Sequence, residues 1–185
     1  GWLGVQPVRR AIVICCGLTL ALGAPLVLAH GWPVLAMGLG SLVAALAYMG
    51  GPRPVAYTPY GELVVFVFFG LVAVAGSDYV QTGSVGTTTW LAGIALGALA
   101  ASALAVNNHR DVAHDRSVGR RTFAVVFGDA TSRAMYALSV FGAFVLLVPM
   151  AWLSSPALLA PLLLAPLALR LQRDFSRSAP GLAYN

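Results

Sequence analysis

Residues 107–116, which read NNHRDVAHDR, hold the side chains of this sequence best suited to chemistry. Asp111 and Asp115 are four positions apart and so share one face of a helix, and Asn107 extends that face by one turn. Two carboxylates and an amide are hard oxygen ligands of the kind that Mg²⁺ takes, together with water and substrate phosphate oxygens. The segment could therefore form a metal–phosphate site.

Arginines near this segment could either complete such a site or cancel its charge. Arg110, Arg120 and Arg121 could bind phosphate oxygens. However, a helix that leaves a membrane often ends in Asn and charged residues that are only solvated. The two aspartates could also pair with Arg110 and Arg116 and have no further role. Spacing alone leaves both interpretations open.

The composition is that of an integral membrane protein. The chain has 185 residues, of which 59% are hydrophobic and 9% charged, and its mean hydropathy is +0.83. A spanning helix needs about 20 apolar residues, and long continuous apolar runs argue against strands. We predict an all-α, polytopic transmembrane helical bundle. Its six spans cover approximately residues 11–29, 33–49, 62–79, 90–106, 134–153 and 156–169, the last being short and rich in proline.

The arginines indicate an orientation for this bundle. All eleven basic residues are arginines, and in a six-span arrangement all of them fall on the side of the loop after Val106. The positive-inside rule makes that side cytoplasmic. Trp32, Trp90 and Trp152 fall near the opposite face, as in an aromatic belt. The same distribution argues against a nucleic-acid surface and leaves the lipid bilayer as the partner of the basic charge.

Two long loops lie on this predicted cytoplasmic side. The first, residues 50–61, is rich in glycine and proline, carries Tyr57 and Tyr60, and is followed by Glu62. These tyrosines could form an interfacial belt, with Glu62 near a helix N-terminus, or a phenol-rich wall beside an aromatic substrate. The pattern alone favours the belt.

The second loop is predicted to run from Asn107 to Arg133. Its apolar stretch, residues 122–128, could anchor at the membrane surface or fold as a short amphipathic helix over the site and exclude water. His109 and His114 lie off the aspartate stripe, so we do not expect them to be ligands.

Two separated signatures resemble a known family. The pattern of Asn107, Asn108, Arg110, Asp111, Asp115, Gly119, Arg120 and Thr122 resembles the second aspartate-rich motif of the UbiA-type intramembrane prenyltransferases, in the 1,4-dihydroxy-2-naphthoate branch of menaquinone biosynthesis. The Gly50–Gly51–Pro52 loop resembles a second signature of that branch, together with the residues that follow it: Tyr57, Gly61, Glu62, Phe66, Phe68, Phe69, Gly70, Tyr79, Val80 and Gln81.

The resemblance implies an activity and a set of site residues. A polyprenyl diphosphate would ionise to an allylic cation, and 1,4-dihydroxy-2-naphthoate would capture the cation and lose CO₂, giving a demethylmenaquinone. Asp111 and Asp115 would be catalytic and, with Asn107, would hold Mg²⁺. The substrate-binding residues would be Asn107, Asn108, Arg110, Arg120, Arg121, Tyr57 and Tyr60. The protein would be a multi-pass protein of the bacterial plasma (inner) membrane, with the aspartate motif on the cytoplasmic side.

The sequence also departs from the family pattern. Arg120 stands where the family often has Lys, which keeps the positive charge. An earlier aspartate-rich motif is not found, and the six spans resemble the third to eighth of about nine family helices. We therefore expect residues 1–185 to be a partial but single prenyltransferase domain, inactive by itself. The alternatives are a family member acting on 4-hydroxybenzoate or homogentisate, and a non-catalytic membrane subunit.

Overall fold

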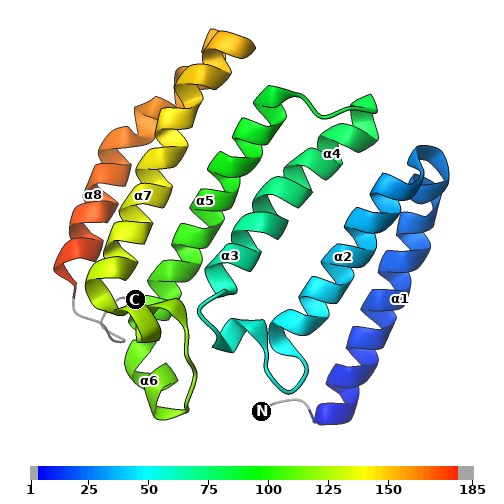
Figure 1. Ribbon diagram of the computed structural model, residues 1–185, viewed down its shortest axis with the longest axis horizontal. Helices are drawn as coiled ribbons and strands as arrows, with labels where there is room; N and C mark the ends of the chain where they lie inside the picture. The colour runs from blue at the N-terminus through cyan, green and yellow to red at the C-terminus, as the bar shows by residue number, and fades with distance from the viewer. Residues whose placement is uncertain (1–3, 179–185) are drawn as a thin grey trace. The chain divides into compact units, whose positions relative to one another are not determined.

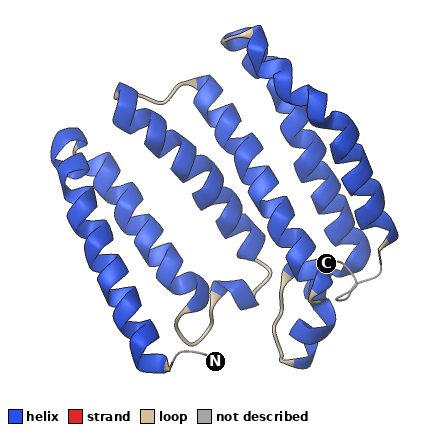
Figure 2. Ribbon diagram, turned by 180° about the vertical axis from the view of Figure 1, so that it is seen from behind, coloured by secondary structure: helices blue, strands red, loops and turns tan. Residues whose placement is uncertain are grey.

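The computed structural model describes residues 4–178, and every regular element in that part is a helix (Figures 1 and 2). The predicted all-α bundle is confirmed. Contacts divide the chain into two compact units, residues 1–45 and 46–185. Each unit is described by itself.

The first unit is a helical hairpin made by α1 (Val5–His30) and α2 (Trp32–Met49). The last turn of α2, residues 46–49, belongs to the second unit. Gly31 makes the turn at a φ of 75°, a conformation that suits glycine, and donates its N–H to the carbonyl of Val27. None of the described residues of α1 or α2 is buried. Such bare apolar surfaces suit a lipid environment.

The second unit is built around one central helix, α5 (Thr87–Arg110) (Figure 1). On one side α5 packs against a continuous helix made of three segments, and on the other against α7 (Phe123–Leu153). The three segments are α3 (Gly61–Val65), the π-helical η2 (Phe66–Val72) and α4 (Ala73–Thr82). The 3₁₀-helix η3 (Pro156–Leu164) and α8 (Ala165–Arg177) pack on α7.

Glycines set the closest approach in this unit. A Cβ atom on Gly70 of η2 would lie 2.4 Å from the carbonyl oxygen of Gly93 and 2.4 Å from the Cα of Gly97, both on α5. The two backbones therefore touch directly, as small residues permit in membrane helices. This contact fixes the separation of η2 and α5. Both of these helices contribute residues to the pocket described below.

Five of the described helices are long and apolar enough to cross a membrane: Val5–His30, Trp32–Met49, Gly61–Thr82, Thr87–Arg110 and Phe123–Leu153. They correspond to the first five predicted spans. The sixth predicted span differs, since it starts as the 3₁₀-helix η3 and continues into α8. Pro161 and Pro166 lack the N–H groups that a regular α-helix needs, and neither segment alone has the length of a span.

The predicted loop between Asn107 and Arg133 is wrong, because most of it is helical. The helix α5 continues to Arg110, turns at Asp111 (φ −91°, ψ 6°), and is followed by the short α6 (Val112–Ser117). The next helix begins at Phe123, well before the predicted residue 134, and is kinked at Gly128 (φ 80°). Polar residues can continue a helix beyond its apolar part, so loss of hydrophobicity did not mark the helix ends.

Candidate functional site

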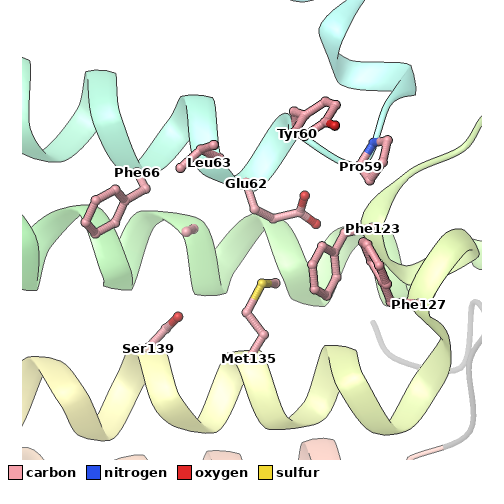
Figure 3. Close-up of a pocket in the computed structure, with 10 residues that line it drawn as sticks. Pro59, Tyr60, Glu62, Leu63, Phe66, Phe123, Phe127, Met135 and Ser139 are labelled. Atoms are coloured by element: carbon pink, nitrogen blue, oxygen red, sulfur yellow. The ribbon is translucent and has the colours of Figure 1, made fainter.

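A pocket of about 410 Å³ opens between α3, α5 and α7 in the second unit (Figure 3). Most of its wall is apolar or aromatic, as is common in pockets for small organic ligands. The lining residues are Pro59, Tyr60, Glu62, Leu63, Phe66, Ala101, Phe123, Phe127, Met135 and Ser139. Phe123 and Phe127 come from the short helical stretch before the Gly128 kink, so part of the apolar segment 122–128 lines this pocket.

One carboxylate lies in this apolar wall. Glu62 is in the first turn of α3, and only 4% of it is exposed. Asn108 of α5 donates its side-chain N–H to Glu62 Oε1 at 2.8 Å, whereas Glu62 Oε2 has no hydrogen-bond partner among residues 4–178. The sequence placed Glu62 correctly near a helix N-terminus, but it did not predict that this carboxylate is buried. Its burial depends on α5, which sequence spacing could not reveal.

The aspartate motif lies where α5 ends. Asp111 accepts two hydrogen bonds from the neighbouring Arg110, at 2.8 Å from Nε and 2.9 Å from Nη2. This hydrogen bonding lowers the pKa of Asp111 from its usual value. The side chain of Asp111 stays 36% exposed, so it is charged and accessible.

Asp115 is in a different environment. It is 3% exposed, accepts a hydrogen bond from Arg120 Nη1 at 3.1 Å and a longer one from Thr122 Oγ1 at 3.4 Å. The hydrogen bond to Asp115 raises the pKa of Arg120. The ion pair expected between an aspartate and Arg116 is not the one formed, because the turn at Gly119 brings Arg120 back onto Asp115.

The two loops predicted on one side of the membrane meet in the structure. The guanidinium of Arg120 lies 4.3 Å from the centre of the Tyr57 ring, a cation–π contact. The backbone N–H of Arg121 also donates to the carbonyl of Tyr57 at 2.9 Å. Tyr60 lines the pocket, whereas Tyr57 holds the arginine segment. The loop tyrosines thus join the pocket to the aspartate motif.

The chain also matches a protein-family model, described as the UbiA prenyltransferase family, over residues 2–181. The chain belongs to this family. The match runs through both structural units.

Several relatives of this UbiA family member carry a more specific name. This chain is 39% identical over 168 residues to a 1,4-dihydroxy-2-naphthoate octaprenyltransferase of Mycobacterium tuberculosis, and the match covers 87% of this chain and 56% of the relative. It is 35% identical over 153 residues to the Escherichia coli protein of the same name, covering 80% and 50%. It is 33% identical over 136 residues to UbiA prenyltransferase domain-containing protein 1 of Xenopus tropicalis, covering 74% and 39%. The chain spans about half the length of the relatives it matches. No solved structure gives a significant match.

UbiA prenyltransferases generally use a divalent metal, for which the aspartate motif supplies the candidate ligands. No group of three or more His, Cys, Asp or Glu side chains comes together among residues 4–178. Mg²⁺ needs only one or two carboxylates when water and phosphate complete its shell. The accessible Asp111 and the exposed Asn107 fit that requirement. Asp115 could serve as a Mg²⁺ ligand only if its ion pair with Arg120 were broken.

A second polar cluster of this UbiA-family chain was missed by the sequence analysis. His109 is buried, and its Nδ1 lies 3.2 Å from Asp129 Oδ1. Arg133 donates to the same aspartate and to the carbonyls of Phe175 and Ser178, at the end of α8. The cluster holds α5, α7 and α8 together. In this cluster the His109 side chain faces Asp129.

Proposed function

We propose that the protein carrying this sequence transfers a polyprenyl group from a polyprenyl diphosphate to 1,4-dihydroxy-2-naphthoate. The names of several relatives support this substrate pair. Membership of the UbiA prenyltransferase family supports the reaction class. The long apolar helices support a reaction within a membrane, where a long apolar donor resides.

The observation that carries the proposal is the connection between the apolar pocket and the aspartate motif. Asn108 of the motif binds Glu62 in the pocket wall. Thr122, which binds Asp115, directly precedes Phe123 of the same wall. A prenyl diphosphate has an apolar tail and a polyanionic head, so a site for it needs both environments next to each other.

The arginines would bind the diphosphate. Arg110 and Arg120 are each held by an aspartate, and Arg121 is exposed beside them. In our proposal the diphosphate takes over Arg110 and Arg120 from Asp111 and Asp115, because guanidinium groups bind phosphate oxygens in a bidentate way. Asp111, Asp115 and Asn107 would then hold Mg²⁺, which supplies neutralising charge for the leaving diphosphate.

The proposed reaction breaks one bond in the donor and forms one bond to the acceptor. The C–O bond of the donor breaks, and its electron pair leaves with the diphosphate. A ring carbon of the naphthoate forms the new C–C bond to the allylic carbon. The carboxyl group is lost as CO₂ and leaves its C–C electron pair on the ring. The product is therefore the reduced naphthoquinol, a demethylmenaquinol, and a separate oxidant would be needed to convert it to the demethylmenaquinone. The aromatic pocket wall excludes water, which would otherwise capture the allylic cation.

The variant Asp111→Asn tests this proposal in the protein carrying this sequence, purified in detergent. We expect at least about a 100-fold loss of Mg²⁺-dependent turnover, because an amide is a poorer Mg²⁺ ligand and leaves diphosphate charge uncompensated. The assay measures CO₂ release and prenylated naphthoquinol. The control Asp174→Asn removes an exposed carboxylate from α8 and should change turnover less than twofold.

Two results would contradict the proposal. Near-normal turnover in Asp111→Asn would reduce the aspartate motif to a solvated helix end. Prenylation of 4-hydroxybenzoate or homogentisate in place of 1,4-dihydroxy-2-naphthoate would keep the reaction class and overturn the acceptor.

A further inference from the structure

The carboxylate of Glu62 is an unusual group for the wall it occupies. Its neighbours around the pocket include Leu63, Phe66, Phe123 and Met135 (Figure 3). Burying a carboxylate in apolar surroundings costs free energy unless its oxygens are hydrogen-bonded. Glu62 is 4% exposed, so water does not provide that compensation from a free surface. Its position therefore calls for a functional explanation.

Asn108 satisfies half of this carboxylate. The Asn108 side chain donates to Oε1 at 2.8 Å and so restrains the orientation of the carboxylate. Oε2 has no hydrogen-bond partner among the described residues, although the group is buried in the pocket wall. The result is one oriented hydrogen-bond acceptor, held by α5 and presented from α3.

We propose that Glu62 positions the aromatic acceptor by accepting a hydrogen bond from one of its ring hydroxyls on Oε2. Asn108 is a positioning residue that orients Glu62. This inference rests on the proposed function, because it assigns a role in the same pocket to the acceptor of that reaction.

The chemistry of the pocket selects a hydroxylated ring over the other parts of the two substrates. Diphosphate and the naphthoate carboxylate are anions and would be repelled by Glu62. The prenyl chain has no hydrogen-bond donor. A phenolic hydroxyl is a donor attached to an apolar ring, and Phe66, Phe123 and Phe127 offer aromatic contacts to such a ring. A cavity of about 410 Å³ lies within the usual range for small organic ligands.

The two consecutive asparagines then have different roles. Asn107 is exposed beside the aspartates, whereas Asn108 points to Glu62. Neighbouring residues on a helix face different directions, so a single Asn–Asn pair can serve the diphosphate side and the acceptor side at once.

Equilibrium binding of two probes tests the inference without relying on turnover. The probes are 1,4-dihydroxy-2-naphthoate, kept reduced, and 2-naphthoate, which has the same carboxylate and no hydroxyl. We expect the unmodified protein to prefer the hydroxylated probe by about tenfold or more, as for a hydrogen bond to a charged group. Glu62→Ala should remove most of that preference, and Glu62→Gln should reduce it while keeping an acceptor for Asn108. Asp174→Asn, the matched loss of an exposed carboxylate, should leave it unchanged.

Steady-state kinetics supply a second measurement. Glu62→Gln should raise KM for the naphthoate about tenfold or more and change KM for the polyprenyl diphosphate less than twofold, a split that a general loss of folding would not produce. The inference is overturned if both Glu62 variants, with unchanged melting temperatures, keep the preference of the unmodified protein, or if that protein shows no preference. Selective binding without any prenylated product would instead overturn the proposed function and leave Glu62 as a hydroxyl-binding residue.

Discussion

Each aspartate of the motif is paired with a different arginine, and the two pairs differ in burial. Asp111 and Arg110 are sequence neighbours and remain accessible. Asp115 is buried, and its partner Arg120 follows the Gly119 turn. Exposed ion pairs contribute little to stability, so the Asp111 pair can be exchanged for substrate at small cost. The Asp115 pair also orders the turn and is expected to matter for the shape of the site.

Arg120 is the arginine for which we make a graded prediction. It binds Asp115 and stacks on Tyr57. We expect Arg120→Ala to raise KM for the polyprenyl diphosphate about tenfold or more, because a charge-assisted hydrogen bond to phosphate is lost. Arg120→Lys should have a smaller effect, since it keeps the charge and loses the planar stacking. KM for each substrate measures the effect.

Arg116 provides the matched control for this prediction. It is exposed on α6, three residues before the Gly119 turn. Arg116→Ala should change KM for the donor less than twofold. Equal effects of the alanine variants at both positions would indicate a general electrostatic attraction in place of a specific contact by Arg120.

Among the helices, the backbone contact between η2 and α5 has the greatest consequence for the site. Gly70 touches Gly93 and Gly97, and Glu62 and Phe66 lie just before it on the same continuous helix. Any separation of these helices would widen the pocket and lengthen the hydrogen bond between Glu62 and Asn108. The glycines of the two helices therefore help to set the geometry of the hydrogen bond between Asn108 and Glu62.

Gly70→Ala tests this contact. The added methyl group would lie 2.4 Å from two backbone atoms of α5, so the helices must move apart. We expect a loss of about 1–3 kcal/mol in the free energy of unfolding, measured by SDS-induced unfolding in detergent. Gly142→Ala in α7 is the control, because a Cβ atom there meets nothing within 4 Å. That change should be neutral or stabilise the helix by up to about 1 kcal/mol. A neutral result for Gly70→Ala would show that the close approach is not required.

For the second unit as a whole, the functional loops gather at one end. The loop before α3 and the segment around α6 lie at the same end of this unit, and the loop between α4 and α5 lies at the other (Figure 1). Arg110, Arg116, Arg120 and Arg121 belong to the first of these ends. By the positive-inside rule we propose that this end faces the cytoplasm.

Cysteine labelling tests this orientation. In a background where Cys15 and Cys16 are replaced by serine, single cysteines at the exposed positions Ser84 and Ser117 should react from opposite sides of the membrane. Ser117 should be protected from an impermeant reagent added to intact cells, and Ser84 should react. Labelling of both cysteines from the outside would contradict the topology. Reaction at position 117 and protection at position 84 would indicate the inverted orientation, with the aspartate motif outside the cell.

The sequence by itself determined the fold class, the first five spans and the motif that carries charge. Continuous apolar runs are a local property, and in lipid they have few structural solutions other than helices. The spacing of Asp111 and Asp115 is also local. It survives the turn between α5 and α6, where the N–H of Asp115 still donates to the carbonyl of Asp111. The resemblance carried by these residues agrees with the family match.

The tertiary structure alone decided which groups meet. Glu62 and Asn108 are separated by 46 positions in the sequence, and Tyr57 reaches Arg120, which lies still further along the chain. Periodicity assigns a residue to a face of its own helix but does not say which helix covers that face. Backbone contact at glycines sets how α5 packs between its neighbours. In this packing the carboxylate of Glu62 is buried in an apolar pocket, whereas the carboxylate of Asp111 stays accessible. The burial of a carboxylate depends on which residues surround it in three dimensions, so a sequence pattern could not predict that Glu62 is buried and Asp111 accessible.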